Sequence, residues 1–541
     1  MMVPVVTPED MRAFDLASPV PIPVLIERAG AAVAAEAIQM LGGTYGRRVL
    51  LLAGTGNNGA DGLAAARILE RRGVRVQTIM ATRHLPLPVR LPSADLIIDA
   101  ILGTGFTGTF TAPETGDTPV LAIDLPSGLD GLSGLVRSPN RAIRADRCVT
   151  FAAWKPGLLF GRGPELAGVT KVVDIGLPVQ SSVHVVDTET AAHRLPIRAR
   201  NAHKWNAAVL VVGGSAGMTG APLLAGAAAM RAGCSMVRIG VPGVEVTGTE
   251  AVGVPMPAEQ WGAAALMFAE RCGAMVLGPG LGRSRVALAA VRATLGRASM
   301  PVVLDGDGLA ALAVDGGEDP DTPIHSTLQR VTTAAVVTEL SPGQRAIREA
   351  SARRVVTPIE AAPSSSDGRG GSVSSIAVAG SGRAVVRAID SSFGAAERVL
   401  SARTPGTTVL TPHDGEYERI TGKSVGANRI LAAQRLAAAT GAVVLLKGAT
   451  TVIADHEGRT ELVRHGDERL ATAGSGDVLS GVIGALIAQG LAPFEAASTG
   501  AYLHAECVLY GPAHGLIASD LVAGLAQAWT GLLQSLHGDT R

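Results

Sequence analysis

The sequence predicts an α/β protein built from two successive units with largely parallel sheets. Short apolar runs typical of buried strands alternate with stretches of helical periodicity through most of the 541 residues, and this alternation favours parallel α/β sheets. Hydrophobic residues make up 47% of the chain and charged residues 17%, which allows a large buried core. Aromatic residues are only 3%, so Ala, Val, Leu and Ile must build that core.

The first unit is expected to begin with a helix over 22–41, where apolar residues recur at helical spacing. Another helix is expected over 59–73. Strands are expected within 47–54, 74–82, 94–102, 119–128, 147–153 and 168–178. A polar linker is predicted over 181–202, which sets the two domains at about 1–190 and 191–541.

The second unit repeats the alternation over a longer stretch. Strand-like or helix-like runs occupy 207–215, 221–233, 235–242, 274–282, 301–309, 408–420, 442–454 and 476–490. The polar segment 313–406 breaks the pattern with "GGEDPDTP" and "APSSSDGRGGSVSS", and long structureless loops are uncommon inside compact domains. It is predicted to be a low-complexity surface insertion, part disordered, with one helix over 393–403.

Composition excludes several classes of function. Lys plus Arg and Asp plus Glu are both 47, so no basic field favours a nucleic acid or an anionic membrane. The four cysteines lie far apart without a C-x-x-C pair, which argues against a zinc knuckle or a disulfide framework. The N-terminus is acidic, and no long uninterrupted apolar run occurs. A cytoplasmic protein is expected.

A glycine-rich loop, "GTGNNG" at 54–59, matches G-x-G-x-x-G between a predicted strand and a predicted helix. A dinucleotide redox site would also need an acidic residue at the end of the next strand, and none occurs in "VRVQTIMATRH". The loop instead carries Asn57, Asn58 and Asp61. A tight turn with asparagine caps is the alternative interpretation.

Two more strand ends carry polar side chains. Asp99 ends one strand before a Gly/Thr-rich loop, and Asp124 and Ser127 end the next. Loops after parallel strands converge on one crevice, where glycine amides suit phosphate and amide, carboxylate and hydroxyl oxygens suit a hard cation. Asp124 is the best-placed carboxylate for acid–base chemistry, although a helix cap would also explain it.

At these residues the sequence resembles the NAD(P)H-hydrate epimerase domain of the YjeF N-terminal type. The motifs, in order, are "GTGNNGADG", "DAILGTGFTG", "IDLPSGLDG" and "FAAWKPGLLFGRGPELAGVTKVVDIGLP", within roughly 5–180. The resemblance implies a Rossmann-like three-layer fold and K⁺ held by Asn58, Asp99 and Ser127. It also implies a hydrated dinucleotide lined by Asn57, Asn58, Gly59, Ala60, Asp61, Gly103, Thr104, Gly105, Phe106, Thr107, Gly108, Thr109 and Asp124.

The second unit contains "AGSGD" at 473–477, directly before an apolar helix. Free amides at that helix start would bind an anion, and Asp477 could take the proton of a hydroxyl about to be phosphorylated. Lys447 and Gly448, with Thr450 and Thr451, follow a strand and suit nucleotide phosphates, although no Walker A motif is present. A glycine-rich turn capped by the aspartate is the alternative.

This pattern resembles the ribokinase-like superfamily, and within it the ADP/ATP-dependent NAD(P)H-hydrate dehydratase domain, over about 196–312 and 407–530. The supporting motifs are "NAHKW", "VVGGSAGMTGAPLLAG", "LGPGLGR", "VVLDGDGL", "LTPHDGEYERITG", "KGATT" and "AGSGD". The chain departs from the family at Trp205, where glycine is usual, and at the long insertion. The resemblance implies substrate contacts from Ala221, Gly282, His413 and Asp477, and nucleotide contacts from Lys447, Gly448, Ala449, Thr450, Thr451 and Gly476.

Together these features predict a bifunctional repair enzyme for hydrated NADH and NADPH. The first domain would interconvert the R and S hydrates with K⁺, and the second would dehydrate the S form with ADP or ATP and Mg²⁺. The enzyme is expected to be a homo-oligomer without nucleic-acid or membrane partners. The alternative is a ribokinase-like small-metabolite kinase, of the hydroxyethylthiazole-kinase type, with a non-catalytic nucleotide-binding first domain.

Overall fold

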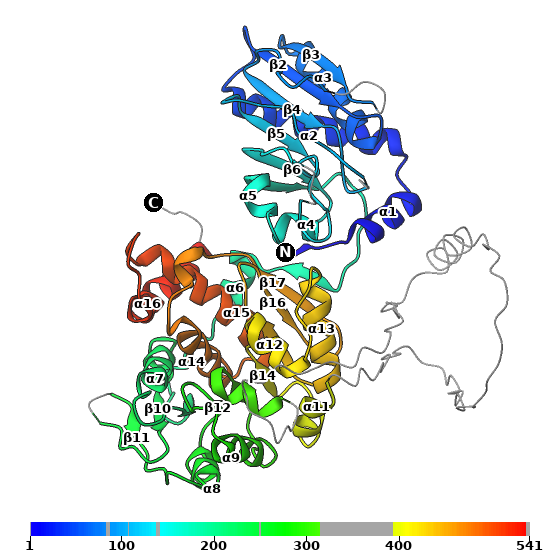
Figure 1. Cartoon of the computed structure of the whole chain (residues 1–541). Coiled ribbons are helices and arrows are strands. Elements are labelled where there is room, and N and C mark those ends of the chain that lie inside the picture. Colours follow the sequence, from blue (N-terminus) through cyan, green and yellow to red (C-terminus); the bar gives the residue numbers. More distant parts are fainter. Residues whose placement is uncertain are drawn as a thin grey trace, which may run out of the picture.

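Two α/β units follow one another along the chain, as the sequence predicted (Figure 1). The computed structural model describes residues 2–82, 87–105, 108–136, 141–247, 250–313 and 393–536. Statements about the fold refer to these residues.

The first unit is built on a parallel sheet. Its described strands have the order β3-β2-β4-β5-β6-β7, and each neighbouring pair is parallel. The strands are β2 (Arg48–Ala53), β3 (Arg75–Met80), β4 (Leu96–Ala100), β5 (Val120–Ile123), β6 (Arg147–Phe151) and β7 (Val169–Val173). The helices are α1 (Pro8–Ala17), α2 (Ile22–Leu41), α3 (Asn57–Arg71), α4 (Pro156–Leu159) and α5 (Gly163–Ala167).

Alternation along the strands places a core on each face of this sheet. Leu51 and Ile98 pack in the core that contains α2 and α3, whereas Leu50 and Ile97 pack in the core that contains α4 and α5. The predicted helix over 22–41 is confirmed as α2, which ends at Gly42 in the left-handed conformation. The result is a three-layer unit whose loops after β2, β4 and β5 share one edge.

The second unit has a larger mixed sheet. Within the described ranges its order is β1-β8-β17-β16-β15-β14-β13-β12-β9-β10-β11, parallel except at β1/β8, β15/β16 and β16/β17. Its strands are β8 (Val183–Val185), β9 (Ala208–Val212), β10 (Met236–Gly240), β11 (Val252–Gly253), β12 (Ala274–Leu277), β13 (Val302–Leu304), β14 (Thr408–Leu410), β15 (Val443–Leu446), β16 (Thr451–Ala454) and β17 (Thr460–Val463).

Helices cover both faces of this sheet (Figure 1). On one face lie α7 (Gly220–Arg231), α14 (Ser475–Ala488), α15 (Pro493–Glu506) and α16 (Ala518–Ser535). On the other lie α8 (Gly262–Ala269), α9 (Arg285–Leu295), α11 (Gly394–Leu400), α12 (Asp414–Thr421) and α13 (Arg429–Thr440). The remaining described elements are α6 (Thr188–Arg194) and the 3₁₀ helices η1 (Gly306–Leu312), η3 (Glu468–Leu470) and η4 (Cys507–Tyr510).

The segment predicted as a polar linker is instead part of the second unit. Strand β8 pairs in parallel with β17, and α6 packs on α15 and α16. The chain start also joins this sheet, because β1 (Val3–Pro4) pairs antiparallel with β8. Alternating polar residues in "SSVHVVDTET" hid a short strand whose pairing partners lie far away in the sequence.

The predicted insertion lies mostly outside the described residues, which resume at Phe393. Phe393, Ala396 and Leu400 are buried in the core, and Arg403 donates to the backbone carbonyls of Ala298 and Met300. The end of the segment therefore belongs to the folded unit, and the helix predicted there is α11. No helix among the described residues is long and apolar enough to cross a membrane.

Candidate active sites

The glycine-rich loop after β2 is shaped by close packing of backbone. A Cβ on Gly59 would lie 1.9 Å from the carbonyl oxygen of Gly54, and a Cβ on Gly54 would lie 2.0 Å from the carbonyl oxygen of Ile101. Neither position has room for a side chain. The glycines therefore let α3 begin against the end of β4, and Ala60 lies inside α3, where its amide donates to Gly56 O.

Asp99 and Ser127 form a buried pair at the ends of β4 and β5. The Ser127 hydroxyl donates to Asp99 Oδ1 at 2.6 Å, and the Ser127 amide donates to Oδ2 at 2.7 Å. Burial raises the pKa of Asp99 to about 6, although the hydrogen bonds from Ser127 work against the rise. Ser127 Oγ in turn accepts from the Leu102 amide, which ties this pair to the loop after β4.

Asn58 completes this cluster from the start of α3. Its Nδ2 donates to the carbonyl oxygen of Leu102 at 3.0 Å. The amide of the same residue, Leu102, donates to Ser127 Oγ. Asn58 Oδ1 is buried and has no hydrogen-bond partner among the described residues. Buried carbonyl oxygens rarely remain unpaired, so the donor set of amide, hydroxyl and carboxylate oxygens fits a hard cation such as K⁺.

Asp124 lies beside this cluster in an unusual backbone conformation, with φ +65°. Its Oδ1 accepts from the Thr150 hydroxyl at 3.0 Å and from Lys155 Nζ at 2.8 Å. Lys155 is 1% exposed and also donates to Thr150 Oγ1 and Phe151 O. Strained backbone persists where surrounding contacts over-determine it, and here a buried lysine fixes the carboxylate.

Two further carboxyl groups face Asp124. Burial, Asp124 and then Asp15 raise the pKa of Asp61 to about 8, while Lys155 lowers it. Burial and then Asp124 likewise raise the pKa of Asp15 on α1, again opposed by Lys155. A carboxyl group with a pKa of about 8 holds its proton more readily at pH 7 than an ordinary aspartate does. The cluster combines one ion pair with a protonated carboxyl group, as an acid–base site requires.

The structure brings most of the predicted epimerase residues together. Gly103 lies close to Asn58 and Asp124, and the Thr104 amide donates weakly to Asp124 Oδ2 at 3.4 Å. Gly105 lies near the guanidinium of Arg12 on α1. Asn57 is exposed at the start of α3, and Gly108 and Thr109 are exposed farther along the second loop. Phe106 and Thr107 lie outside the described residues.

In the second unit, α14 begins against a partly buried lysine. A Cβ on Gly476 would lie 3.4 Å from Lys447 Nζ and 3.9 Å from Asp305 Oδ2. Lys447 Nζ donates to Asp305 Oδ1 at 3.2 Å and lies 3.5 Å from Glu416 Oε2. Burial alone would lower the pKa of Lys447, but these two carboxylates outweigh it and raise the pKa. A cation is thus held beside the free amides of a helix start.

Asp477 lies in the first turn of α14, within this charged group. Burial and the negative charge of Asp305 raise the pKa of Asp477 to about 7, while Lys447 lowers it and Asp307 and Glu416 add to the rise. A carboxyl group with a pKa near neutrality is suited to general acid–base catalysis at that pH. Behind it, burial lowers the pKa of His504 to about 4, and its Nε2 lies 3.2 Å from Ser475 Oγ.

Two segments predicted to contact substrate, the start of α7 and the loop after β12, lie side by side. A Cβ on Gly280 would lie 3.1 Å from Ala221 Cβ, and Ser215 Oγ donates to Gly280 O. The Gly282 amide donates to Asp307 Oδ2 at 3.0 Å. Because Asp307 is one of the carboxylates that raise the pKa of Asp477, Gly282 is linked to the predicted base.

His413 is the N-cap of α12. Its Nδ1 accepts from the Gly415 and Glu416 amides, and its own amide donates to Glu416 Oε2. The capping box satisfies the first turn of the helix and leaves the ring half exposed, with its Nε2 3.6 Å from Glu416 Oε2. Glu416 Oε2 therefore lies near both the His413 ring and Lys447 Nζ, so the cap places the ring beside the charged group.

The predicted nucleotide loop divides into two parts. Lys447 lies in the charged group, and Gly448 passes close to the Arg429 guanidinium, which donates to Lys447 O at 2.6 Å. Thr450 points the other way, because its hydroxyl donates to Leu159 O of the first unit at 2.6 Å. Thr451 Oγ1 bonds weakly to Gly448 O at 3.4 Å. The Thr450 side chain therefore holds the loop in place.

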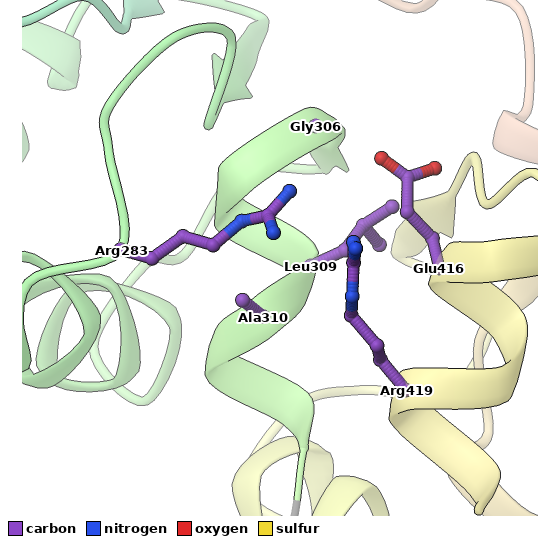
Figure 2. Close-up of a pocket in the computed structure, with 6 residues that line it drawn as sticks. All are labelled: Arg283, Gly306, Leu309, Ala310, Glu416 and Arg419. Carbon is purple, nitrogen blue, oxygen red and sulfur yellow. The ribbon is translucent and has the colours of Figure 1, made fainter. Parts of the chain in front are cut away.

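A small pocket opens beside this group (Figure 2). Its lining residues are Arg283, Gly306, Leu309, Ala310, Glu416 and Arg419. Figure 2 shows Arg283 reaching in from its loop and Arg419 and Glu416 projecting from α12. Arg283 Nε donates to Asp307 Oδ1 at 2.8 Å, so the pocket adjoins the carboxylates around Asp477.

Several residues of these sites were missed from the sequence. Asp305 follows β13 directly, just as Asp124 follows β5, so the strand-end rule applied to every strand would have found it. Lys155 lies farther beyond its strand, since β6 ends at Phe151, and that rule gives no signal for it. Asp15 and Glu416 lie on helices, where spacing gave no signal. Trp205, which departs from the family pattern, packs against the guanidinium groups of Arg271 and Arg238, which lie 4.0 and 4.8 Å from its ring centre.

The fold and the two centres define a class of fused α/β proteins in which each unit sets a carboxyl group and a lysine at the edge of its sheet. A family model described as NAD(P)H-hydrate dehydratase matches residues 209–326 and 391–520. A second, the YjeF-related protein N-terminus, matches 23–90 and 81–157.

Curated relatives match over nearly the whole length. The bifunctional NAD(P)H-hydrate repair enzyme of Moorella thermoacetica is 31% identical over 547 residues, covering 90% of this chain and 87% of the relative. That of Mycobacterium tuberculosis (strain H37Rv) is 32% identical over 515 residues, covering 89% and 88%. The chain belongs to the family of bifunctional NAD(P)H-hydrate repair enzymes.

Among solved structures, the ADP/ATP-dependent NAD(P)H-hydrate dehydratase of Bacillus subtilis, co-crystallised with ATP and Mg²⁺, is 25% identical. Its TM-score is 0.43, and the match covers 64% of this chain and 98% of that chain.

Proposed function

We propose that this protein repairs hydrated NADH and NADPH, with epimerisation in the first unit and nucleotide-dependent dehydration in the second. The observation that carries the proposal is the pairing of two separate acid–base centres within one chain of this family. Asp124 lies against Lys155, and Asp477 lies among Asp305, Glu416 and Lys447. Products of the first centre are substrates of the second.

In the second unit, Asp477 would take the proton from the hydroxyl of the S hydrate as that oxygen attacks the terminal phosphorus of ADP or ATP. The phosphoester then eliminates phosphate, with loss of a proton from the neighbouring ring carbon, and the double bond of the nicotinamide ring is restored. Lys447 and the amides at the start of α14 would bind phosphate oxygens. Phosphorylation turns a poor leaving group into a good one.

In the first unit, epimerisation requires a proton to move to and from the hydroxyl at the hydrated carbon. Asp124, fixed by Lys155 and Thr150, is suited to act as the base, and the protonated Asp61 is suited to act as the acid. The carboxylate of Asp124 would also stabilise positive charge that develops on the ring as the hydroxyl leaves. Re-addition of water from the other face gives the opposite epimer.

Metal ions are part of this proposal. Asn58, Asp99 and Ser127 would hold K⁺, and the unpaired buried Oδ1 of Asn58 supports that role. The ion would supply positive charge for the dinucleotide phosphates. Mg²⁺ would accompany the nucleotide in the second unit, as is usual in phosphoryl transfer. Cytoplasmic location and self-association stay predictions from the sequence.

The two roles are tested by paired variants in the full-length protein. Asp477→Asn should abolish nucleotide-dependent dehydration and leave epimerisation intact. Asp124→Asn should abolish epimerisation and leave dehydration intact, so that only the S hydrate is consumed. Loss of both activities in either variant, with the fold unchanged by circular dichroism, would contradict separable sites. A stable phosphoester product would instead favour the small-metabolite kinase.

A further inference from the structure

The two units meet at the nucleotide loop of the second. Thr450 lies within the predicted phosphate-binding segment, three residues after Lys447. Its hydroxyl is buried and donates to the carbonyl oxygen of Leu159, the last residue of α4, at 2.6 Å. Leu159 is also buried. A buried hydroxyl needs a partner, so this bond fixes the loop against α4.

Other contacts hold the same part of the first unit against the same sheet. The guanidinium of Arg464, which follows β17, lies 4.6 Å above the ring centre of Trp154. The Trp154 amide donates to Pro4 O, and Trp154 O accepts from the Val6 amide. Strand β1, which contains Pro4, pairs with β8; β8 pairs with β17, and β17 pairs with β16. Residues 154–159 are thus tied to the hairpin that carries Thr451.

The same short segment carries Lys155 of the first active site. Lys155 donates to Asp124 and directly precedes α4, whose last carbonyl receives Thr450. A single helical turn therefore lies between the epimerase lysine and the nucleotide loop. The hydrogen bond and the packed tryptophan give a direct path by which a change in the loop can act on that turn.

We propose that the first unit positions the nucleotide-binding loop of the second through the hydrogen bond from Thr450 to Leu159, and that nucleotide binding in turn orders α4 beside Lys155. Thr450 is then a positioning residue whose side chain acts through Leu159. This inference rests on the proposed nucleotide site. Linkage requires the coupling to be reciprocal, so either unit can report it.

The test uses full-length protein with ADP as the probe. Thr450→Val keeps the shape of the side chain and removes the hydrogen bond, and we expect its Kd for ADP by calorimetry to rise about tenfold. Thr450→Ser keeps the hydroxyl and should restore most of that loss. Trp154→Leu, in the first unit, should also raise the Kd, and its effect should be less than additive with that of Thr450→Val.

Hydrogen exchange separates positioning from a direct contact with ADP. In the wild type, ADP should slow exchange of the amides of residues 157–160, and Thr450→Val should remove that protection. Unchanged exchange in this segment, or an unchanged Kd in Thr450→Val, would overturn the inference. Binding of ADP without turnover of any hydrate would refute the proposed function alone, and absence of binding of both ADP and ATP would refute the inference and the proposed function together.

Discussion

The pH dependence of dehydration tests the assignment of Asp477 most sharply. Burial and Asp305 raise the pKa of Asp477 to about 7, and a base must be deprotonated to act. With that pKa, about one tenth of the enzyme is active at pH 6 and about nine tenths at pH 8. The value of kcat/KM for the S hydrate should therefore fall about fivefold from pH 7 to pH 6, and about tenfold for each further pH unit.

Asp305→Asn is the matched perturbation. After burial, the charge of Asp305 is the largest cause of the raised pKa of Asp477. The substitution removes that charge and keeps Lys447, which lowers the pKa. The acidic limb of the plot of kcat/KM against pH should move to lower pH by about one unit, equivalent to about 1.4 kcal/mol. Asp61→Asn, in the other unit, should leave the limb in place.

The assay follows formation of NADH from purified S hydrate by absorbance, at saturating nucleotide and constant ionic strength. The terminal phosphate of the nucleotide also titrates, near a pKa of about 6. Its titration is the same for every variant, so only a shift between variants reports the enzyme. A wild-type limb near pH 4, or no movement in Asp305→Asn, would refute the role of Asp477 as the base.

Three further predictions concern the first unit. Lys155→Met should abolish epimerisation and lower the free energy of unfolding by about 3 kcal/mol, because Asp124 loses its buried partner; an unchanged urea midpoint would contradict this. Gly59→Ala should also abolish epimerisation, because its Cβ would overlap the carbonyl of Gly54; activity within twofold of wild type would show that the loop can shift. Asn58→Ala should raise the K⁺ concentration for half-maximal epimerase activity by tenfold or more, because it removes the unpaired amide oxygen; an unchanged K⁺ dependence would place the ion elsewhere.

The sequence predicted the parts of the fold that rest on local pattern. Buried parallel strands such as Ala208–Val212 read as continuous apolar runs, and the helix over 22–41 has clear periodicity. Strand β8 and helix α6 were missed, because a three-residue strand with polar neighbours carries little local signal. The place of β8 in the sheet depends on its pairing with β17, which lies far away in the sequence.

The sites were predicted where polar residues follow strands. Asn58, Asp99, Asp124 and Ser127 lie together, as three converging loops required. The partners that set their chemistry were less visible. Lys155 was quoted in a motif without a role, and no spacing rule links it to Asp124, 31 positions earlier. Side chains that adjust pKa values act through space, and only the fold shows which of them are close.

Dual turnover of mixed hydrates tests the central claim most directly. An equal mixture of R and S NADH hydrates is incubated with the protein, K⁺, Mg²⁺ and either ADP or ATP, and the absorbance of NADH is followed to completion. The account predicts that one of the nucleotides supports recovery of NADH from both epimers. Recovery that stops at the S half, or accumulation of a stable phosphoester, would contradict it.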